Sequence, residues 1–284
     1  MTAAHPIASG TAAVNGTTLF YERHGVGPSL VLIEGLGVAT WIWDDQIPAF
    51  APHFHVIAYD NRGMGHSATP PGPYSIATFA EDLLALLDHL AIERTHLLGV
   101  SMGGYIAIEF AIRWPERVDR LVLAATGPGG SVQIPMSPAT REQLLATHGT
   151  PRDIIRAKLP LAFSESWLAQ ADIEAMIDLR LKQPQPRHAF QAQAAAGAAF
   201  DRAADLHRIT APTLVLAAEA DRVVPPENGD YLAARIPDSR LIRYPDLGHQ
   251  FWVEDPAAFN RDVLAFLRGA EPDPTPSRTP EPPV

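Results

Sequence analysis

Short apolar runs alternate with longer amphipathic segments along most of the chain, and this alternation limits its fold more than any other feature. Such runs are typical of strands in a parallel sheet, because helices cover both faces of that sheet. The segments at 75–90 and 255–267 carry apolar side chains at helical spacing. The pattern predicts an α/β fold with a mostly parallel central sheet and helices on both faces. The predicted strands are SLVLI (29–33), HVIAY (55–59), THLLGV (95–100), RLVLAA (120–125), TLVLAA (213–218) and RLIRY (240–244).

Three segments lie outside this alternation. Residues 11–22 predict a hairpin, since the Asn-Gly pair at their centre suits a type I′ turn. Residues 128–209 hold helical stretches separated by prolines and glycines, which favours a helical insertion, because structureless loops of that length are rare. The core then comprises residues 1–127 and 210–269. The Pro-rich, apolar-poor tail 270–284 is predicted to be disordered.

The composition restricts the classes of partner and compartment. The 284 residues include no cysteine, which excludes disulfides and a cysteine nucleophile and fits a reducing cytoplasm. A formal charge of −10 argues against nucleic acid or an anionic membrane surface as a main partner. The first ten residues do not resemble a signal peptide, and no apolar run approaches the roughly 18 residues of a membrane span. We therefore predict a cytoplasmic monomer or homodimer with no nucleic-acid or membrane partner.

A G-x-S-x-G motif, formed by Gly99, Ser101 and Gly103, marks the candidate nucleophile. It lies where the strand-like HLLGV gives way to the helical GGYIAIEF, which is the context that gives this motif its meaning. The turn between strand and helix is so sharp that longer side chains two residues away would meet backbone, which accounts for the glycines. The following helix N-terminus favours negative charge developing nearby.

A serine hydroxyl needs a base, and the base needs an orienting acid. Of eleven histidines, His249 stands out because it follows the last predicted strand, at the edge where α/β sheets assemble their ligand sites. Asp221 follows the preceding strand and is the candidate acid. The rival acids are weaker candidates by position: Glu219, Asp246, Glu254 and Asp255. His53 and His55 form an H-x-H pair without further ligands grouped near them, which gives little support to a metal site.

The order Ser101, Asp221, His249 resembles that of the α/β-hydrolase triad. Three further segments resemble the same family in the same order, and the helical insertion falls where this family carries its cap. These segments are DNRGMGHS (60–67), PTLVLAAEADRVVP (212–225) and GHQFWVEDP (248–256). The nearest resemblance is to the branch that contains 3-oxoadipate enol-lactonases and bacterial esterases, through EGLG, PPGPY, GVSMGG and PERV.

This resemblance implies a serine hydrolase that cleaves a carboxylic ester or lactone through an acyl-enzyme on Ser101, with no metal or cofactor. The resemblance also implies that the backbone N–H groups of Leu36 and Met102 form the oxyanion hole. We also expect an apolar pocket between core and cap, suited to a small-molecule ester or lactone with an apolar acyl part. Its candidate lining residues are Trp41, Trp43, Phe163, Trp167, Met176, Phe251 and Trp252, although each could equally be a core residue.

Other activities use the same triad. A C–C bond hydrolase acting on a β-diketone-like acid usually has cationic cap residues for the substrate carboxylate. Cofactor-free perhydrolase or haloperoxidase activity is a secondary alternative. A catalytically slow ligand receptor on this fold is a further one, and the intact triad argues against it. The cap cations available for the first alternative are Arg152, Arg156, Lys158, Arg180 and Lys182.

Glu34 departs from the family pattern, because many relatives have histidine at the start of this loop. A carboxylate facing the oxyanion would oppose the charge that catalysis must stabilise. We therefore expect Glu34 to turn away, to pair with Arg62 or with backbone N–H groups, and to support the loop at 35–37.

Overall fold

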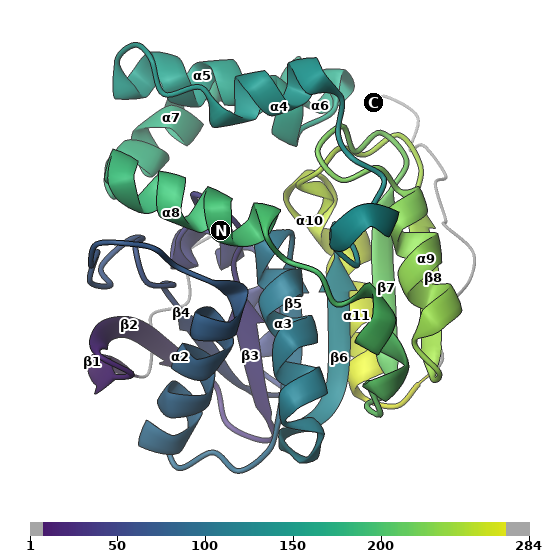
Figure 1. Ribbon diagram of the computed structural model, residues 1–284. Coiled ribbons are helices and arrows are strands. Elements are labelled where there is room, and N and C mark those ends of the chain that lie inside the picture. The colour runs from purple at the N-terminus through teal and green to yellow at the C-terminus, as the bar shows by residue number, and fades with distance from the viewer. Residues whose placement is uncertain (1–7, 271–284) are drawn as a thin grey trace.

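The computed structural model describes residues 8–270, and within them eight strands form one sheet in the order β1-β2-β4-β3-β5-β6-β7-β8 (Figure 1). β1 pairs antiparallel with β2, β2 pairs antiparallel with β4, and all the other pairings are parallel. The predicted mostly parallel sheet is confirmed. The strands are β1 (Ala8–Val14), β2 (Thr17–His24), β3 (Ser29–Ile33), β4 (His55–Tyr59), β5 (Thr95–Val100), β6 (Val118–Ala124), β7 (Thr213–Ala218) and β8 (Ser239–Tyr244).

Helices cover both faces of this sheet and also form an insertion between β6 and β7. The core helices are α1 (Ile47–Phe50), α2 (Ile76–His89), α3 (Met102–Arg113), α9 (Glu227–Arg235), α10 (Phe251–Glu254) and α11 (Pro256–Leu267). The insertion, called the cap below, contains α4 (Pro138–Leu145), α5 (Pro151–Ala162), α6 (Glu165–Leu168), α7 (Ile173–Leu181) and α8 (Arg187–Ala198). Short 3₁₀ helices are η1 (Thr40–Trp43), η2 (Pro115–Arg117), η3 (Gly130–Val132) and η4 (Ala203–Arg208).

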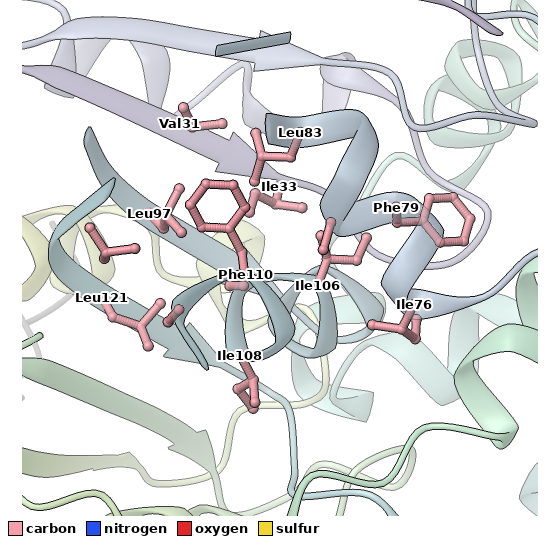
Figure 2. Packing of buried hydrophobic residues seen from close by; sticks show 14 of the residues in the cluster. Val31, Ile33, Ile76, Phe79, Leu83, Leu97, Ile106, Ile108, Phe110 and Leu121 are labelled. Carbon is pink, nitrogen blue, oxygen red and sulfur yellow. The ribbon is translucent and has the colours of Figure 1, made fainter. Parts of the chain in front are cut away.

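The apolar runs supply side chains to both faces, because successive residues of a strand point in opposite directions. In β3, Val31 and Ile33 pack in the cluster that contains α2 and α3, whereas Leu30 and Leu32 pack in the cluster that contains α1 and α11. Figure 2 shows the first of these clusters, with Phe110 of α3 beside the strand residues. This two-sided burial explains why the strands are almost uniformly apolar.

The predicted hairpin joins β1 and β2, with positive φ at both Asn15 and Gly16, as a type I′ turn requires. The cap lies over the edge of the sheet where the parallel strands end (Figure 1). All of its named elements are helical. The predicted disordered tail beyond Ala270 and the first seven residues of the chain lie outside the described residues.

Candidate active site

Ser101 occupies the turn between β5 and α3 with a φ of 54°, a backbone conformation that side-chain-bearing residues seldom adopt. The turn is held by the Ser101 N–H, which donates to the Ala124 carbonyl oxygen at 2.9 Å, and by Thr126 Oγ1, which donates to the Ser101 carbonyl oxygen at 2.8 Å. A Cβ at Gly103 would lie 2.1 Å from the Ile33 carbonyl oxygen. The glycine is therefore needed for close packing, and the serine side chain is presented at the strand end.

The structure brings the three candidate catalytic side chains into one hydrogen-bonded row. His249 Nε2 lies 3.1 Å from Ser101 Oγ, and His249 Nδ1 lies 2.8 Å from Asp221 Oδ2. The other oxygen, Asp221 Oδ1, accepts the backbone N–H groups of Val223 and Val224, each at 2.8 Å. His249 and Asp221 are both buried, so their contact is shielded from bulk water.

The rival acids have other contacts. Glu219 forms an ion pair with Arg243 at the surface. Asp255 caps α11 by accepting the Ala258 N–H, as its predicted place at a helix start suggests. Among the candidate acids, the one favoured by its position in the sequence, Asp221, is therefore the carboxylate that contacts His249.

Glu254 ties the loop that carries His249 to the cap. One carboxylate oxygen accepts the N–H groups of Gly248 and Ser164, both at 2.9 Å, and the other accepts the Ser164 hydroxyl at 2.5 Å. The Gln250 N–H donates to the Ala162 carbonyl oxygen at 2.7 Å. The position of the histidine loop is therefore fixed by the cap segment between α5 and α6.

The loop after β3 passes very close to the nucleophile. A Cβ at Gly35 would lie 3.0 Å from the Ser101 Cβ, which is tighter than an ordinary contact between side chains. Leu36 and Met102 line the same cavity as Ser101 and His249. Backbone of the loop and of the α3 N-terminus therefore borders the space next to the serine hydroxyl.

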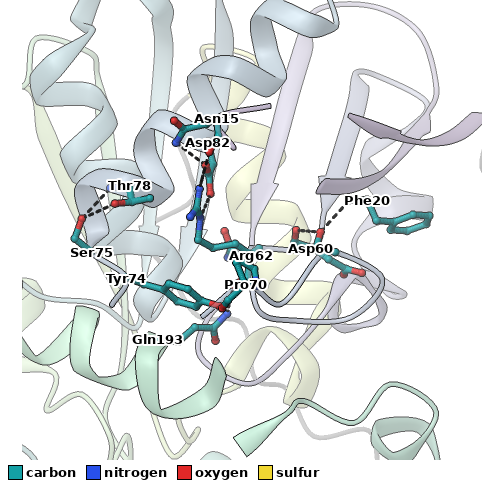
Figure 3. A network of polar contacts seen from close by, with 12 residues as sticks. Asn15, Phe20, Asp60, Arg62, Pro70, Tyr74, Ser75, Thr78, Asp82 and Gln193 are labelled. Atoms are coloured by element: carbon teal, nitrogen blue, oxygen red, sulfur yellow. Dashed lines mark hydrogen bonds and ion pairs between the residues drawn. The ribbon is translucent and has the colours of Figure 1, made fainter. Parts of the chain in front are cut away.

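Glu34 is fully buried and turns toward the neighbouring loop after β4. Its Oε1 accepts the Asn61 N–H at 2.5 Å, while Asn61 Nδ2 donates to the Glu34 carbonyl oxygen at 3.3 Å. Of the two expected partners of Glu34, the backbone N–H group is confirmed, whereas the pairing with Arg62 is wrong. Arg62 forms a two-pronged contact with Asp82 instead, with Nε and Nη2 each 2.5 Å from a carboxylate oxygen (Figure 3).

Burial raises the pKa of Glu34 well above its ordinary value, and the nearby carboxylate of Asp60 raises it further. Glu34 therefore favours its neutral form, and glutamine is the uncharged isostere of that form. The folded protein holds this proton more tightly than the unfolded chain does. Hence the contribution of the proton to stability is complete below the unfolded pKa of about 4.5 and is lost as pH rises through the folded pKa.

We expect Glu34→Gln to match the wild type in stability near pH 4.5 and to become progressively more stable than it as pH rises. Each unit by which the folded pKa exceeds the unfolded one corresponds to about 1.4 kcal/mol. Thermal unfolding of both proteins between pH 4.5 and pH 9 measures this difference. The matched control, Glu93→Gln at an exposed position, should show a difference that does not grow with pH. A Glu34→Gln difference that stays constant over this range would contradict a neutral Glu34.

A cavity of about 1260 Å³ lies between core and cap and includes Ser101 and His249 among its lining residues. Of the predicted pocket residues, Trp41 and Trp252 line it. Among the described residues the lining does not include the other candidates, so their assignment to the pocket is corrected. These are Trp43, Phe163, Trp167, Met176 and Phe251.

The misplaced aromatic residues pack elsewhere. Trp43 and Phe251 are fully buried in the core on the α11 side of the sheet. Phe163 stacks on Trp167 with 4.5 Å between ring centroids, inside a small apolar cluster of the cap. In contrast, Tyr105 and Phe200, which stack at 4.6 Å, line the cavity without having been singled out. No local motif marks them, because both stand in ordinary helical or loop context.

The described part of the chain offers neither a membrane-spanning helix nor a metal-binding cluster. Within residues 8–270 no helix is both long enough and apolar enough to cross a membrane. Nor does that part of the chain contain a group of three or more histidine, aspartate or glutamate side chains arranged to hold a metal ion. His55, half of the H-x-H pair, accepts a hydrogen bond from Arg23 Nε at 2.9 Å.

Comparison with known proteins places this site in a family. The alpha/beta hydrolase fold family matches residues 28–256. A protein of Caulobacter segnis named "Putative carbamate hydrolase RutD" is 32% identical over 268 residues, which cover 92% of this chain and 99% of that protein.

Two solved structures are also similar. A hydrolase from Pseudomonas aeruginosa has a TM-score of 0.82 and 34% identity, covering 93% of this chain and 99% of its own. The enol-lactonase from Burkholderia xenovorans has a TM-score of 0.81 and 30% identity, covering 91% and 100%. The chain therefore belongs to the alpha/beta hydrolase fold family and is an enzyme of that family.

Proposed function

We propose that this protein is a serine hydrolase that cleaves a carboxylic ester or a lactone through an acyl-enzyme on Ser101. The observation that carries the proposal is the row of contacts from Ser101 Oγ to His249 Nε2 at 3.1 Å and from His249 Nδ1 to Asp221 Oδ2 at 2.8 Å. A hydroxyl, an imidazole and a carboxylate in this order form an activated nucleophile with its base and its orienting acid.

Acylation begins when His249 Nε2 takes the proton from Ser101 Oγ and that oxygen attacks the substrate carbonyl carbon. Asp221 Oδ2 accepts a hydrogen bond from the Nδ1–H group of His249, which leaves Nε2 with the free lone pair and stabilises the imidazolium that forms. Because Asp221 is itself held by two backbone N–H groups, the imidazole keeps its orientation through the step. The imidazolium then gives its proton to the leaving alkoxide oxygen, and the acyl group remains on the serine.

The tetrahedral intermediate carries negative charge on the former carbonyl oxygen. We assign its stabilisation to the backbone N–H groups of Leu36 and Met102, two residues that line the same cavity as Ser101. Each such donor is typically worth a factor of roughly 10²–10³ in rate. A water molecule deprotonated by His249 then attacks the acyl-enzyme, and collapse of the second intermediate releases the carboxylic acid and returns the proton to Ser101.

The cavity supports an ester or lactone with an apolar portion. Besides Ser101, its lining includes Val38, Leu144, Ile155, Leu161 and Phe190. Such apolar walls with a few convergent polar groups are typical of small-molecule sites. The names of the relatives include a carbamate hydrolase and an enol-lactonase, both of which denote attack on an acyl carbonyl, and the proposed chemistry is common to both.

Labelling with a fluorophosphonate tests the nucleophile. We expect the folded wild type to be labelled stoichiometrically and Ser101→Ala to remain unlabelled, because the reagent reacts with activated serine hydroxyls. A panel of p-nitrophenyl esters of increasing chain length, simple lactones, an aryl carbamate and a β-diketone acid then identifies the bond that is cleaved. Absence of labelling in folded wild-type protein would overturn the proposal, and cleavage of the β-diketone acid alone would replace it with C–C bond hydrolysis.

A further inference from the structure

Gln250 follows His249 directly and lines the cavity around Ser101. Two hydrogen bonds hold its backbone: its N–H donates to the Ala162 carbonyl oxygen at 2.7 Å, and its carbonyl oxygen accepts the Val253 N–H at 2.9 Å. Only 7% of the residue is exposed. Its position beside the candidate general base is therefore well defined.

The side-chain amide of Gln250 has one orientation. Its Oε1 accepts a hydrogen bond from Arg180 Nη2 at 3.1 Å, and a guanidinium is a donor only, so the amide nitrogen cannot take that place. Arg180 is in turn held by Trp41, with the guanidinium carbon 5.2 Å from the centre of the indole ring. Because hydrogen bonds polarise one another, a cation on the amide oxygen makes the N–H bonds at the other end stronger donors.

Gln250 differs from the other buried glutamines that the structure describes. Gln46 Nε2 donates to the Trp252 carbonyl oxygen and Gln193 Nε2 donates to the Arg62 carbonyl oxygen, both at 2.8 Å. Gln250 Nε2 has no acceptor in the described part of the chain, yet it is not one of the polar atoms that the fold seals off from water. Since the residue lines the cavity, this nitrogen faces the cavity.

An oriented donor in a largely apolar cavity selects among ligands. A ligand that displaces water from such a donor loses affinity unless it returns the hydrogen bond. An uncharged oxygen suits the donor, because a primary amide carries no net charge and burying an ion would add a desolvation penalty. The partner that Gln250 Nε2 lacks in the protein is therefore expected from the substrate.

We propose that Gln250 is a specificity-determining residue, whose Nε2 donates a hydrogen bond to an uncharged acceptor of the substrate apart from the carbonyl that is attacked. Arg180 acts through Gln250 and is a positioning residue. The inference rests on the proposed function and narrows its substrate class to esters or lactones that bear a further neutral oxygen, such as an ether or a ketone. An ester whose chains are wholly hydrocarbon leaves the donor unpaired.

Esters in which one methylene group is replaced by an ether oxygen test this inference, since the replacement keeps the chain length. Ethyl pentanoate is compared with ethyl ethoxyacetate and ethyl β-methoxypropanoate, and butyl acetate with methoxyethyl acetate, so that the oxygen lies on either side of the scissile bond. The measured quantity is the ratio of kcat/KM for the ether to kcat/KM for its alkyl parent, from a pH-stat at pH 7. Comparing this ratio between proteins cancels the intrinsic reactivity of each ester.

Gln250→Met keeps the bulk and removes the donors, so it should lower this ratio by roughly threefold to thirtyfold for at least one ether. Gln250→Glu keeps the shape and the contact with Arg180, and it should also lower the ratio because a carboxylate has no N–H. Arg180→Met should lower it by less, and should add nothing in the Gln250→Met background. Gln170→Met, at an exposed position of the cap, should leave the ratio at its wild-type value.

The outcomes separate this inference from the proposed function. If both Gln250 variants keep the wild-type ratio for every ether, the donor site is overturned and the hydrolase remains. A further fall caused by Arg180→Met in the Gln250→Met background would overturn its positioning role. If none of these esters is hydrolysed, calorimetry with the wild type decides: tighter binding of an ether than of its parent, lost in Gln250→Met, supports the donor site, and absence of that preference overturns it. Fluorophosphonate labelling of the wild type then reports separately on the proposed function.

Discussion

Replacing Ser101 with alanine is expected to lower kcat for the best ester of the panel by about 10⁴–10⁶. The expected loss is this large because acylation needs the serine oxygen itself, and no neighbouring group can take its place in the row with His249 and Asp221. The variant should keep its fold, since the hydroxyl contributes only the contact with His249 Nε2. Steady-state kinetics together with a melting curve measures both quantities.

The double variant Ser101→Ala/His249→Ala sharpens this test. When two residues act in the same catalytic step, removing the second changes kcat little once the first is gone. The double variant should therefore have about the same kcat as Ser101→Ala alone. Any rate that remains above that of the uncatalysed reaction in water would then come from the oxyanion donors and from substrate binding. A fall of less than tenfold in Ser101→Ala would show that another residue is the nucleophile.

Gly103→Ala is expected to cost about 3 kcal/mol of stability or more, because overpacking here is combined with a shift of backbone. The new Cβ would lie 2.1 Å from the Ile33 carbonyl oxygen and 2.6 Å from that of Glu34. Both atoms belong to the backbone at the end of β3, so no side chain can rotate away to make room. The thermal midpoint should fall by roughly 6–12 °C, with loss of activity, because the loop that contains Leu36 is pushed from Ser101.

Gly197→Ala is the matched control for this substitution. Gly197 lies within α8, and the nearest atoms to its added Cβ are 3.9 Å away. Alanine is favoured over glycine in a helix interior, so the control should gain up to about 1 kcal/mol. A Gly103→Ala protein that melts within a degree of the wild type would show that the contact between β3 and the nucleophile turn is not tight.

The strands and the grouping of the candidate triad were predictable because each depends on local signals. Apolar runs such as β3 have both faces buried, which the sequence records as uninterrupted hydrophobicity. Asp221 and His249 each follow a strand at the same edge of a parallel sheet, so their meeting with Ser101 required no knowledge of loop conformation. For the same reason the order of the motifs along the chain was sufficient to indicate the family.

The pocket was less predictable because its walls depend on how cap helices pack. Trp41 and Trp43 are two residues apart on η1, yet one lines the cavity and the other is buried in the core. The rings of Phe163 and Trp167 stack on each other inside the cap. The expected pairing of Glu34 with Arg62 was wrong for a similar reason, since Arg62 pairs with Asp82 of α2, 20 residues away in sequence. The expected backbone N–H partner was found.

The bridge formed by Glu254 makes the cap and the general base mechanically inseparable. Lifting the cap as a rigid lid would either break the contacts of Ser164 with Glu254 and of Ala162 with Gln250, or carry the histidine loop with it. If the contacts hold, opening the cap would displace the imidazole of His249 from Ser101. Under the proposed mechanism, acylation of Ser101 would then require the closed cap.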